Sequence, residues 1–245
     1  MKRNLIFHAG CPDGFGAAWA ARRTWGDDAR YIPRSHDDDF DPERFEDELV
    51  IFAAIYPTNP LLLRLGEVAG ELLVLDPHLT ARDHLASDPR LENTLTANGH
   101  RVHFDLEQSG AMLAWNHFHP DEPAPDLLRY VQDQDLWNWE LPESEEINAA
   151  IGSYPRRHDD WDKLAARPIG SLADEGRPIV RANRIEVARA LAPAHPVAIG
   201  SVRIEAVNAR RPRAEIGQEL ATRAKYGQPW GVVFRAVGRR VACAL

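Results

Sequence analysis

Short apolar runs alternate with amphipathic stretches along the first half of the chain. The apolar runs have the length of buried strands, and several end at a polar residue or a turn. The stretches between them repeat their apolar residues at helical spacing. This alternation is typical of a parallel sheet with helices on both faces. The sequence predicts an α/β fold, with strands at residues 5–8, 29–33, 49–55, 71–76 and 101–104 and helices at residues 14–25, 59–69, 90–98 and 109–117.

The second half of the chain has a different pattern. Residues 126–191 are predicted to be mostly helical, and the last of these helices ends before Pro193 and Pro196. Beyond them, residues 197–207 alternate as a strand or hairpin, residues 214–225 form a helix, and two strands flank a turn at Gly238. We therefore expect a parallel-sheet domain over 1–155, a helical connector over 156–194 and a small C-terminal α/β domain over 195–245.

Composition narrows the class of protein. The chain has 245 residues, a net charge of −8 and two cysteines. No apolar run approaches the roughly 20 residues that span a bilayer, and no secretory leader is evident. The negative charge argues against adhesion to long nucleic acid but leaves room for a small phosphate ligand. Two cysteines without a disulfide framework fit a reducing cytoplasm, so we expect a cytoplasmic protein without membrane contact.

The first candidate site follows the first predicted strand. His8 ends that strand, and a turn with Cys11 and Asp13 leads into a helix rich in small residues. Open α/β sheets place ligands at such strand ends, and helix N-termini attract anions. The alternative is a structural connection with an aspartate that caps the helix. Gly14 and Gly16 are no dinucleotide fingerprint, because the third glycine is missing.

Three further groups of polar residues follow predicted strands or helices. Asp76 and His78 end one strand, Ser109 caps a helix, and Asp133 and Asp135 precede two tryptophans. Carboxylates and imidazoles together hold cations such as Mn²⁺ or Mg²⁺. Acids at strand ends are also common caps and turn formers, so the hypothesis rests on their joint occurrence.

The order of these motifs resembles that of the DHH phosphoesterases, especially the bacterial branch of oligoribonucleases that act on very short RNAs. The resemblance is specific because four motifs occur in order. They are His8-x-x-Cys11-Pro12-Asp13-Gly14-Phe15, Leu75-Asp76-Pro77-His78-x-Thr80-Ala81, Phe104-Asp105-x-Glu107-x-Ser109-Gly110-Ala111 and Asp133-x-Asp135-Leu136-Trp137.

The resemblance implies a Mn²⁺-dependent hydrolase, with Mg²⁺ as an alternative ion, that cleaves short oligoribonucleotides or small nucleotide phosphodiesters. It implies a catalytic domain over 1–155 and a substrate-binding domain over 195–245. By the same resemblance, His78 contacts the phosphate and Ser109 is an anion donor. The implied metal ligands are His8, Asp13, Asp76 and Asp133. Separately, Arg210, Arg211 and Arg213 form a basic segment that either grips a phosphate backbone or is a plain surface loop.

Departures from the family pattern put catalysis in doubt. Ala54 stands where the family has an aspartate shared by two metals, and Pro77 stands where it has a histidine ligand. Neither side chain offers a donor. Cys11 replaces an acid, as in other members of this branch. We therefore expect impaired hydrolysis. One alternative is an inactive relative that binds a nucleotide or protein partner in the former active-site cleft. Another is an otherwise active enzyme in which Ala54 or Pro77 is an introduced substitution.

The remaining candidates carry weaker signals. His36 begins an acidic run interpreted as a solvated turn, with a metal loop as the alternative. His117 and His119 are expected to be a surface pair. Trp137 and Trp139 either stack a base or pack in the core, with the core favoured. The C-terminal domain is shorter than the family's. Its last strand would leave an unpaired edge, through which a homodimer is one interpretation.

Overall fold

The structure is a computed structural model that describes residues 1–210, 212–237 and 240–244. The chain divides into two compact units, Met1–Gly176 and Arg177–Leu245. The boundary between the units falls inside the stretch 156–194 that was expected to be a connector. Its first part belongs with the N-terminal unit.

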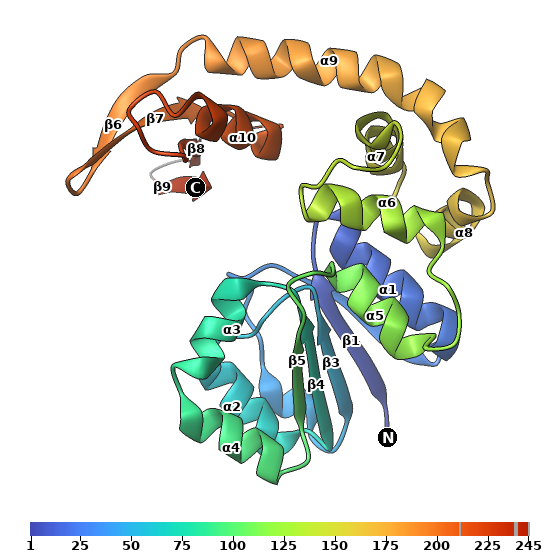
Figure 1. The fold of residues 1–245 in the computed structure, drawn as a ribbon. Helices are drawn as coiled ribbons and strands as arrows, with labels where there is room; N and C mark the ends of the chain where they lie inside the picture. The colour runs from blue at the N-terminus through green and yellow to red at the C-terminus, as the bar shows by residue number, and fades with distance from the viewer. Residues whose placement is uncertain (211, 238–239, 245) are drawn as a thin grey trace. The chain divides into compact units, whose positions relative to one another are not determined.

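The N-terminal unit is built on a parallel sheet of five strands, as predicted (Figure 1). The strands are β1 (Arg3–His8), β2 (Ala29–Arg34), β3 (Leu49–Ala53), β4 (Glu71–Asp76) and β5 (Arg101–Phe104). Their order in the sheet is β2-β1-β3-β4-β5. The direction of winding therefore reverses between β1 and β3, and ligands of open α/β sheets bind at the carboxyl ends of strands at such a switch point.

Helices cover both faces of this sheet (Figure 1). One face carries α1 (Pro12–Trp25) and α5 (Gly110–Phe118), and the other carries α2 (Asn59–Val68), α3 (Leu79–Ala86) and α4 (Pro89–Ala97). In β1, Leu5 and Phe7 pack into the hydrophobic core between the sheet and the α1–α5 side. Ile6 packs into the core on the side of α2, α3 and α4. A strand buried on both faces is apolar throughout, which explains the continuous apolar runs.

A helical layer completes the unit beside α1 and α5. It consists of α6 (Asp126–Asp135), α7 (Ser144–Ser153), α8 (His158–Ala165) and the 3-10 turn η2 (Ile169–Leu172); another such turn, η1 (Pro42–Phe45), precedes β3. Trp19 of α1 lies 5.9 Å from Trp115 and 6.3 Å from Trp161 between ring centroids. This aromatic cluster fixes α8 against α1, so α8 packs as part of the N-terminal unit.

The C-terminal unit begins within the long helix α9 (Ala173–Leu191) and is a small α/β unit, as predicted. Its sheet has the order β6-β7-β8-β9, formed by β6 (His195–Ile199), β7 (Val202–Asn208), β8 (Val232–Val237) and β9 (Arg240–Ala244). Helix α10 (Arg213–Arg223) packs on this sheet through Ile216 and Leu220. Gly238, the predicted turn, lies outside the described residues. Within the described part of the chain, no helix has the length and apolar character needed to cross a membrane.

Candidate functional site

Three neighbouring strands bring their carboxyl ends together at the switch point. His8 is the last residue of β1, Asp76 is the last residue of β4, and Ala54 follows β3. The strand register pairs Phe7 with Ala53 and Ala53 with Leu75. The next position along each strand therefore places Ala54 between His8 and Asp76.

The start of α1 closes over the end of β1. Cys11 is the N-cap of α1, and its Sγ accepts a hydrogen bond from Gly14 N at 3.2 Å and lies 3.3 Å from His8 Nδ1. A Cβ on Gly14 would lie 2.2 Å from the His8 carbonyl oxygen, so only glycine fits this approach. Burial raises the pKa of Cys11 to about 11, which keeps the thiol protonated at neutral pH. Cys11, rather than Asp13, caps this helix.

Asp13 instead holds the start of α5. Its Oδ1 accepts a hydrogen bond from Ala111 N at 2.7 Å, and its Oδ2 accepts one from Gly110 N at 3.1 Å. The carboxylate is buried, and this burial raises the pKa of Asp13 against the opposing effect of these hydrogen bonds and of Ser109. Asp13 thus meets the positive end of the α5 dipole and joins α1 to α5.

The same contacts leave Ser109 without access to a ligand. Ser109 is the N-cap of α5, is fully buried, and hydrogen bonds to Asp13. Its backbone N donates to Gln132 Oε1 at 3.0 Å. The expected role of Ser109 as an anion donor does not fit this burial, because the donors at the start of α5 already serve Asp13.

Asp76 is the most deeply buried charged group of the site, with a side chain that is 0% exposed. Its Oδ1 accepts hydrogen bonds from His78 N at 2.8 Å and from His78 Nδ1 at 3.0 Å. This pairing raises the pKa of the exposed His78. The other oxygen, Oδ2, is buried and has no partner. A buried carboxylate oxygen of this kind suits a cation or a donor group of a ligand.

Two acids at the end of α6, Asp133 and Asp135, lie two positions apart and have different surroundings. Asp133 is buried, and its oxygens accept hydrogen bonds from Glu140 N at 3.0 Å and Leu141 N at 3.3 Å. These bonds commit Asp133 to the loop after α6, which does not support its expected role as a metal ligand. Asp135 faces Asp13 and His78 instead: desolvation and the Asp13 charge raise its pKa to about 7. Asp135 stays exposed to solvent, so this desolvation is partial.

Two more residues, His36 and Arg156, join the cluster. The His36 ring lies 5.6 Å from the His8 ring, although His36 was interpreted as part of a solvated turn. The charge of the exposed Arg156 acts on Cys11. Neither follows a motif, because each reaches the site only through the folding of a distant loop. Burial, assisted by His36 and His78, lowers the pKa of His8.

Other predicted residues lie elsewhere. His119 is not a surface residue: its ring stacks on Trp115 at 4.2 Å, and its Nε2 lies 2.9 Å from the Ala20 carbonyl oxygen. Arg210 and Arg213 belong to the C-terminal unit, where both are exposed and Arg213 begins α10. Arg211 lies outside the described residues. A role of these arginines in substrate binding stays a prediction.

The site gathers metal-ligand types without a complete ligand set. Among the described residues, no group of three or more His, Cys, Asp or Glu is arranged to hold a metal ion. Ala54 and the buried Pro77 occupy two positions in the cluster without offering a donor. Chemically, the site offers one buried carboxylate oxygen without a partner, the imidazoles of His8, His36 and His78, and an exposed carboxylate of raised pKa.

Comparisons with known proteins leave the family open, since no family model matches the chain. The uncharacterized protein R106 of Acanthamoeba polyphaga mimivirus is 31% identical over 157 residues, which cover 58% of this chain and 35% of the viral protein. The chain thus matches about a third of that relative's length. An uncharacterized protein from Helicobacter pylori G27 has a solved structure that aligns over 96% of this chain and 83% of its own, with a TM-score of 0.40 and 8% identity. That similarity is too low to support an argument.

Proposed function

We propose that this chain is a relative of the DHH phosphoesterases that binds a short oligoribonucleotide or a small nucleotide at the strand ends, with impaired hydrolysis. One observation carries the proposal: His8, Ala54 and Asp76 meet at the switch point beside the capped start of α1. Phosphate ligands of open α/β proteins bind there. The four ordered motifs also support it, because three of them supply residues to this one cluster.

The residues fit one divalent cation, Mn²⁺ or Mg²⁺, held by Asp76 and His8. The unpartnered, buried Oδ2 of Asp76 is the donor that such an ion requires. Imidazole favours Mn²⁺ over Mg²⁺. Burial raises the pKa values of Asp13 and Asp135, so positive charge beside them would be stabilising. An ion with two protein ligands completes its shell with water and phosphate oxygens, so we expect the cation and the nucleotide to bind together.

A second cation does not fit. Ala54 and Pro77 provide no ligand, and both oxygens of Asp13 accept hydrogen bonds from α5. A bound cation would supply positive charge to a phosphate oxygen. His78 adds a donor of its own: Asp76 fixes its Nδ1 and raises its pKa, which leaves Nε2 for the phosphate. These groups suit binding more than the activation of water.

Calorimetric titration with a diribonucleotide, with and without Mn²⁺, tests this proposal. We expect binding that requires Mn²⁺, and we expect Asp76→Asn to weaken it about tenfold or more, as for the loss of one charge-assisted contact. Asp83→Asn is the matched control, because Asp83 is an exposed acid of α3 that pairs with Arg82. Equal binding by the wild type and Asp76→Asn would contradict the proposal. Binding of a protein partner alone would favour the alternative function.

A second candidate function is slow residual hydrolysis, and the backbone at Ala54 favours a hydrolytic origin. Ala54 has a φ of 57°, a left-handed conformation that aspartate and asparagine adopt more readily than alanine. The double variant Ala54→Asp with Pro77→His is expected to gain Mn²⁺-dependent cleavage of a diribonucleotide. Ala54→Asn with Pro77→His is the control without the second carboxylate. No gain in the first variant would rule out a dormant hydrolase.

Two finer expectations accompany this function. The first is a cytoplasmic location, as two cysteines without a disulfide framework indicate. The second is a homodimer through the last strand, because β9 lies at one edge of the C-terminal sheet and an edge strand offers unpaired backbone groups. Sedimentation velocity of the full chain measures the second directly.

A further inference from the structure

Two tryptophans beside the site are not part of the hydrophobic core, contrary to the interpretation that the sequence favoured. Trp137 and Trp139 are half-exposed, and neither belongs to a core cluster among the described residues or packs against one. Their ring centroids lie 5.3 Å apart at an interplanar angle of 79°. An edge-to-face pair of this kind fixes both rings and leaves ring surface open for a further planar group.

The backbone holds both side chains in a conformation that is unfavourable for bulky residues. The φ angle is 61° at Trp137 and 56° at Trp139. A tryptophan with positive φ is an outlier, and such outliers cluster at ligand-binding sites, where the surrounding structure holds them in place. A loop selected for stability alone would have glycine or asparagine at these positions.

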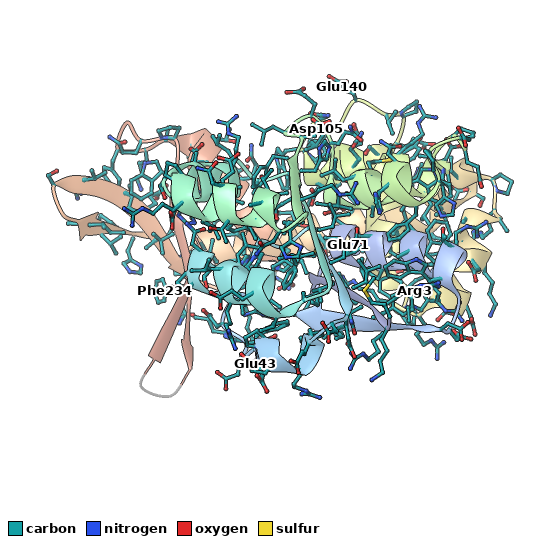
Figure 2. The ribbon with its side chains drawn as sticks, turned by 90° about the horizontal axis from the view of Figure 1, so that it is seen from below. Arg3, Glu43, Glu71, Asp105, Glu140 and Phe234 are labelled. Carbon is teal, nitrogen blue, oxygen red and sulfur yellow. The ribbon has the colours of Figure 1, made fainter. Side chains whose placement is uncertain are left out.

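Asp133 holds the loop after α6, which carries Trp137 and Trp139. Its side chain accepts hydrogen bonds from Glu140 N and Leu141 N, and its carbonyl oxygen accepts one from Asn138 N at 2.9 Å. Glu140, at the rim of the view in Figure 2, marks where the loop reaches the surface. One buried acid thus fixes the two tryptophans in a rigid turn.

The turn begins at the functional site itself. Gln132, in the last turn of α6, accepts a hydrogen bond from Ser109 N at 3.0 Å, and the next two N–H groups of α5, at Gly110 and Ala111, bind Asp13. The loop with Trp137 and Trp139 directly follows this end of α6. Aromatic rings beside a phosphate site are typical platforms for base stacking, which tolerates any base.

We propose that Trp137 and Trp139 form a stacking platform for one nucleobase of the ligand whose phosphate lies at His8 and Asp76. This inference rests on the proposed function, because it takes the phosphate position from it. It goes further by assigning the base contact to the N-terminal unit alone. The platform then provides affinity for nucleotides over other phosphate compounds.

Calorimetric titration with adenosine 5′-monophosphate and with ribose 5-phosphate, both in Mn²⁺, tests the platform. The wild type is expected to bind the nucleotide about tenfold or more tightly than the sugar phosphate, the effect of one stacked base. In Trp137→Asn and Trp139→Asn, this preference is lost and ribose 5-phosphate binding is unchanged. Asparagine accepts a positive φ, so these variants keep the turn. Trp25→Leu is the control, because Trp25 is half-buried against Phe118 at the far end of α1.

The outcomes separate this inference from the proposed function. Equal affinity of the wild type for both compounds, or an equal loss of both in the tryptophan variants, overturns the platform while the phosphate site stands. Tryptophan-dependent binding of the nucleotide without binding of ribose 5-phosphate supports the platform and overturns the phosphate site. An absence of nucleotide binding to the wild type overturns both.

Discussion

Asp133 and Asp135 lie two positions apart at the end of α6 and have opposite roles. Asp133 is buried and satisfied by two backbone N–H groups. Asp135 is exposed, accepts no such bonds, and has a pKa raised to about 7 by desolvation and by Asp13. The first acid stabilises the fold, whereas the second lowers stability at neutral pH, because its charge is desolvated beside that of Asp13. A side chain that lowers the stability of the fold beside a candidate site is typical of a residue that serves binding.

The contrast predicts opposite effects of removing each charge. The folded state holds the Asp135 proton up to about pH 7, whereas the unfolded chain releases it near 3.8, so this group loses stability as pH rises from about 4 to 7. Without metal, Asp135→Asn is therefore expected to raise the free energy of unfolding at pH 8 by about 1 kcal/mol, discounted for exposure, and to change little at pH 4.

Asp133→Asn is the partner experiment at the same helix end. It weakens two charge-assisted hydrogen bonds and is expected to lower the free energy of unfolding by about 1.5–3 kcal/mol at pH 8. Urea unfolding curves of both variants at the two pH values give the comparison. Destabilisation by Asp135→Asn at pH 8 would contradict the assignment of these two acids.

Some residues of the site could be predicted from the sequence, and others could not. His8, Asp76 and His78 were predictable as a cluster, because each ends a strand of one parallel sheet or directly follows one. The choice between Asp133 and Asp135 was not, since it depends on which side chain the following loop binds. His36 was considered as part of a metal loop and interpreted as a solvated turn, and Arg156 was not considered, because only tertiary folding brings them near His8 and Cys11.

At the scale of elements, close packing of helix starts on strand ends shapes the site. A Cβ on Gly110 would lie 2.3 Å from Ala54 Cβ and 2.8 Å from Asp13 Oδ2. The start of α5 therefore sits directly on the end of β3, and this contact aims the α5 N–H groups at Asp13. Those hydrogen bonds join α5 to α1, while the close approach of Gly110 to Ala54 sets α5 on the end of β3.

Gly110→Ala tests this packing. The added methyl group has no space, so we expect a loss of about 1–3 kcal/mol in the free energy of unfolding and weaker nucleotide binding as Asp13 shifts. Gly152→Ala in α7 is the matched control: nothing lies within 4 Å of its Cβ position. There, a gain of about 0.5–1 kcal/mol is expected from helix propensity. Thermal unfolding of both variants measures these changes in the free energy of unfolding. Equal changes in the two variants would contradict the tight contact at Gly110.

The elements themselves were largely predictable, and the exceptions have physical causes. The five parallel strands follow from apolar runs that are buried on both faces. Helix α3 was not predicted, because half of its residues from Leu79 to Ala86 are polar and only Ala81 and Leu85 are buried. Helix α9, the last helix of the predicted helical stretch, begins at Ala173 and continues through Pro178.

At the scale of the whole molecule, the division at Gly176 separates the site from the predicted arginine contacts. All residues of the proposed cation site and platform belong to Met1–Gly176, whereas Arg210 and Arg213 belong to the other unit. The change to a helical pattern, together with Pro193 and Pro196, placed the sequence-based boundaries at 155 and 194. The packing of α8 on Trp19 leaves no trace in that pattern.

A fragment of residues 1–176 tests this division. We expect it to unfold cooperatively and to bind adenosine 5′-monophosphate with Mn²⁺ as tightly as the full chain does. A longer oligoribonucleotide is expected to bind the fragment more weakly than the full chain if the arginines contact its backbone. Scanning calorimetry and titration measure both properties. A fragment that folds without binding the mononucleotide would show that the second unit completes the site.

The proposed function requires one cation position whose occupation is coupled to nucleotide binding. Titration of the full chain with Mn²⁺, followed by calorimetry with and without adenosine 5′-monophosphate, measures this coupling. We expect one ion per chain, bound weakly alone and about tenfold or more tightly with the nucleotide, because the phosphate completes the coordination shell. Two ions per chain with cleavage of a diribonucleotide, or no bound ion in either titration, would contradict it.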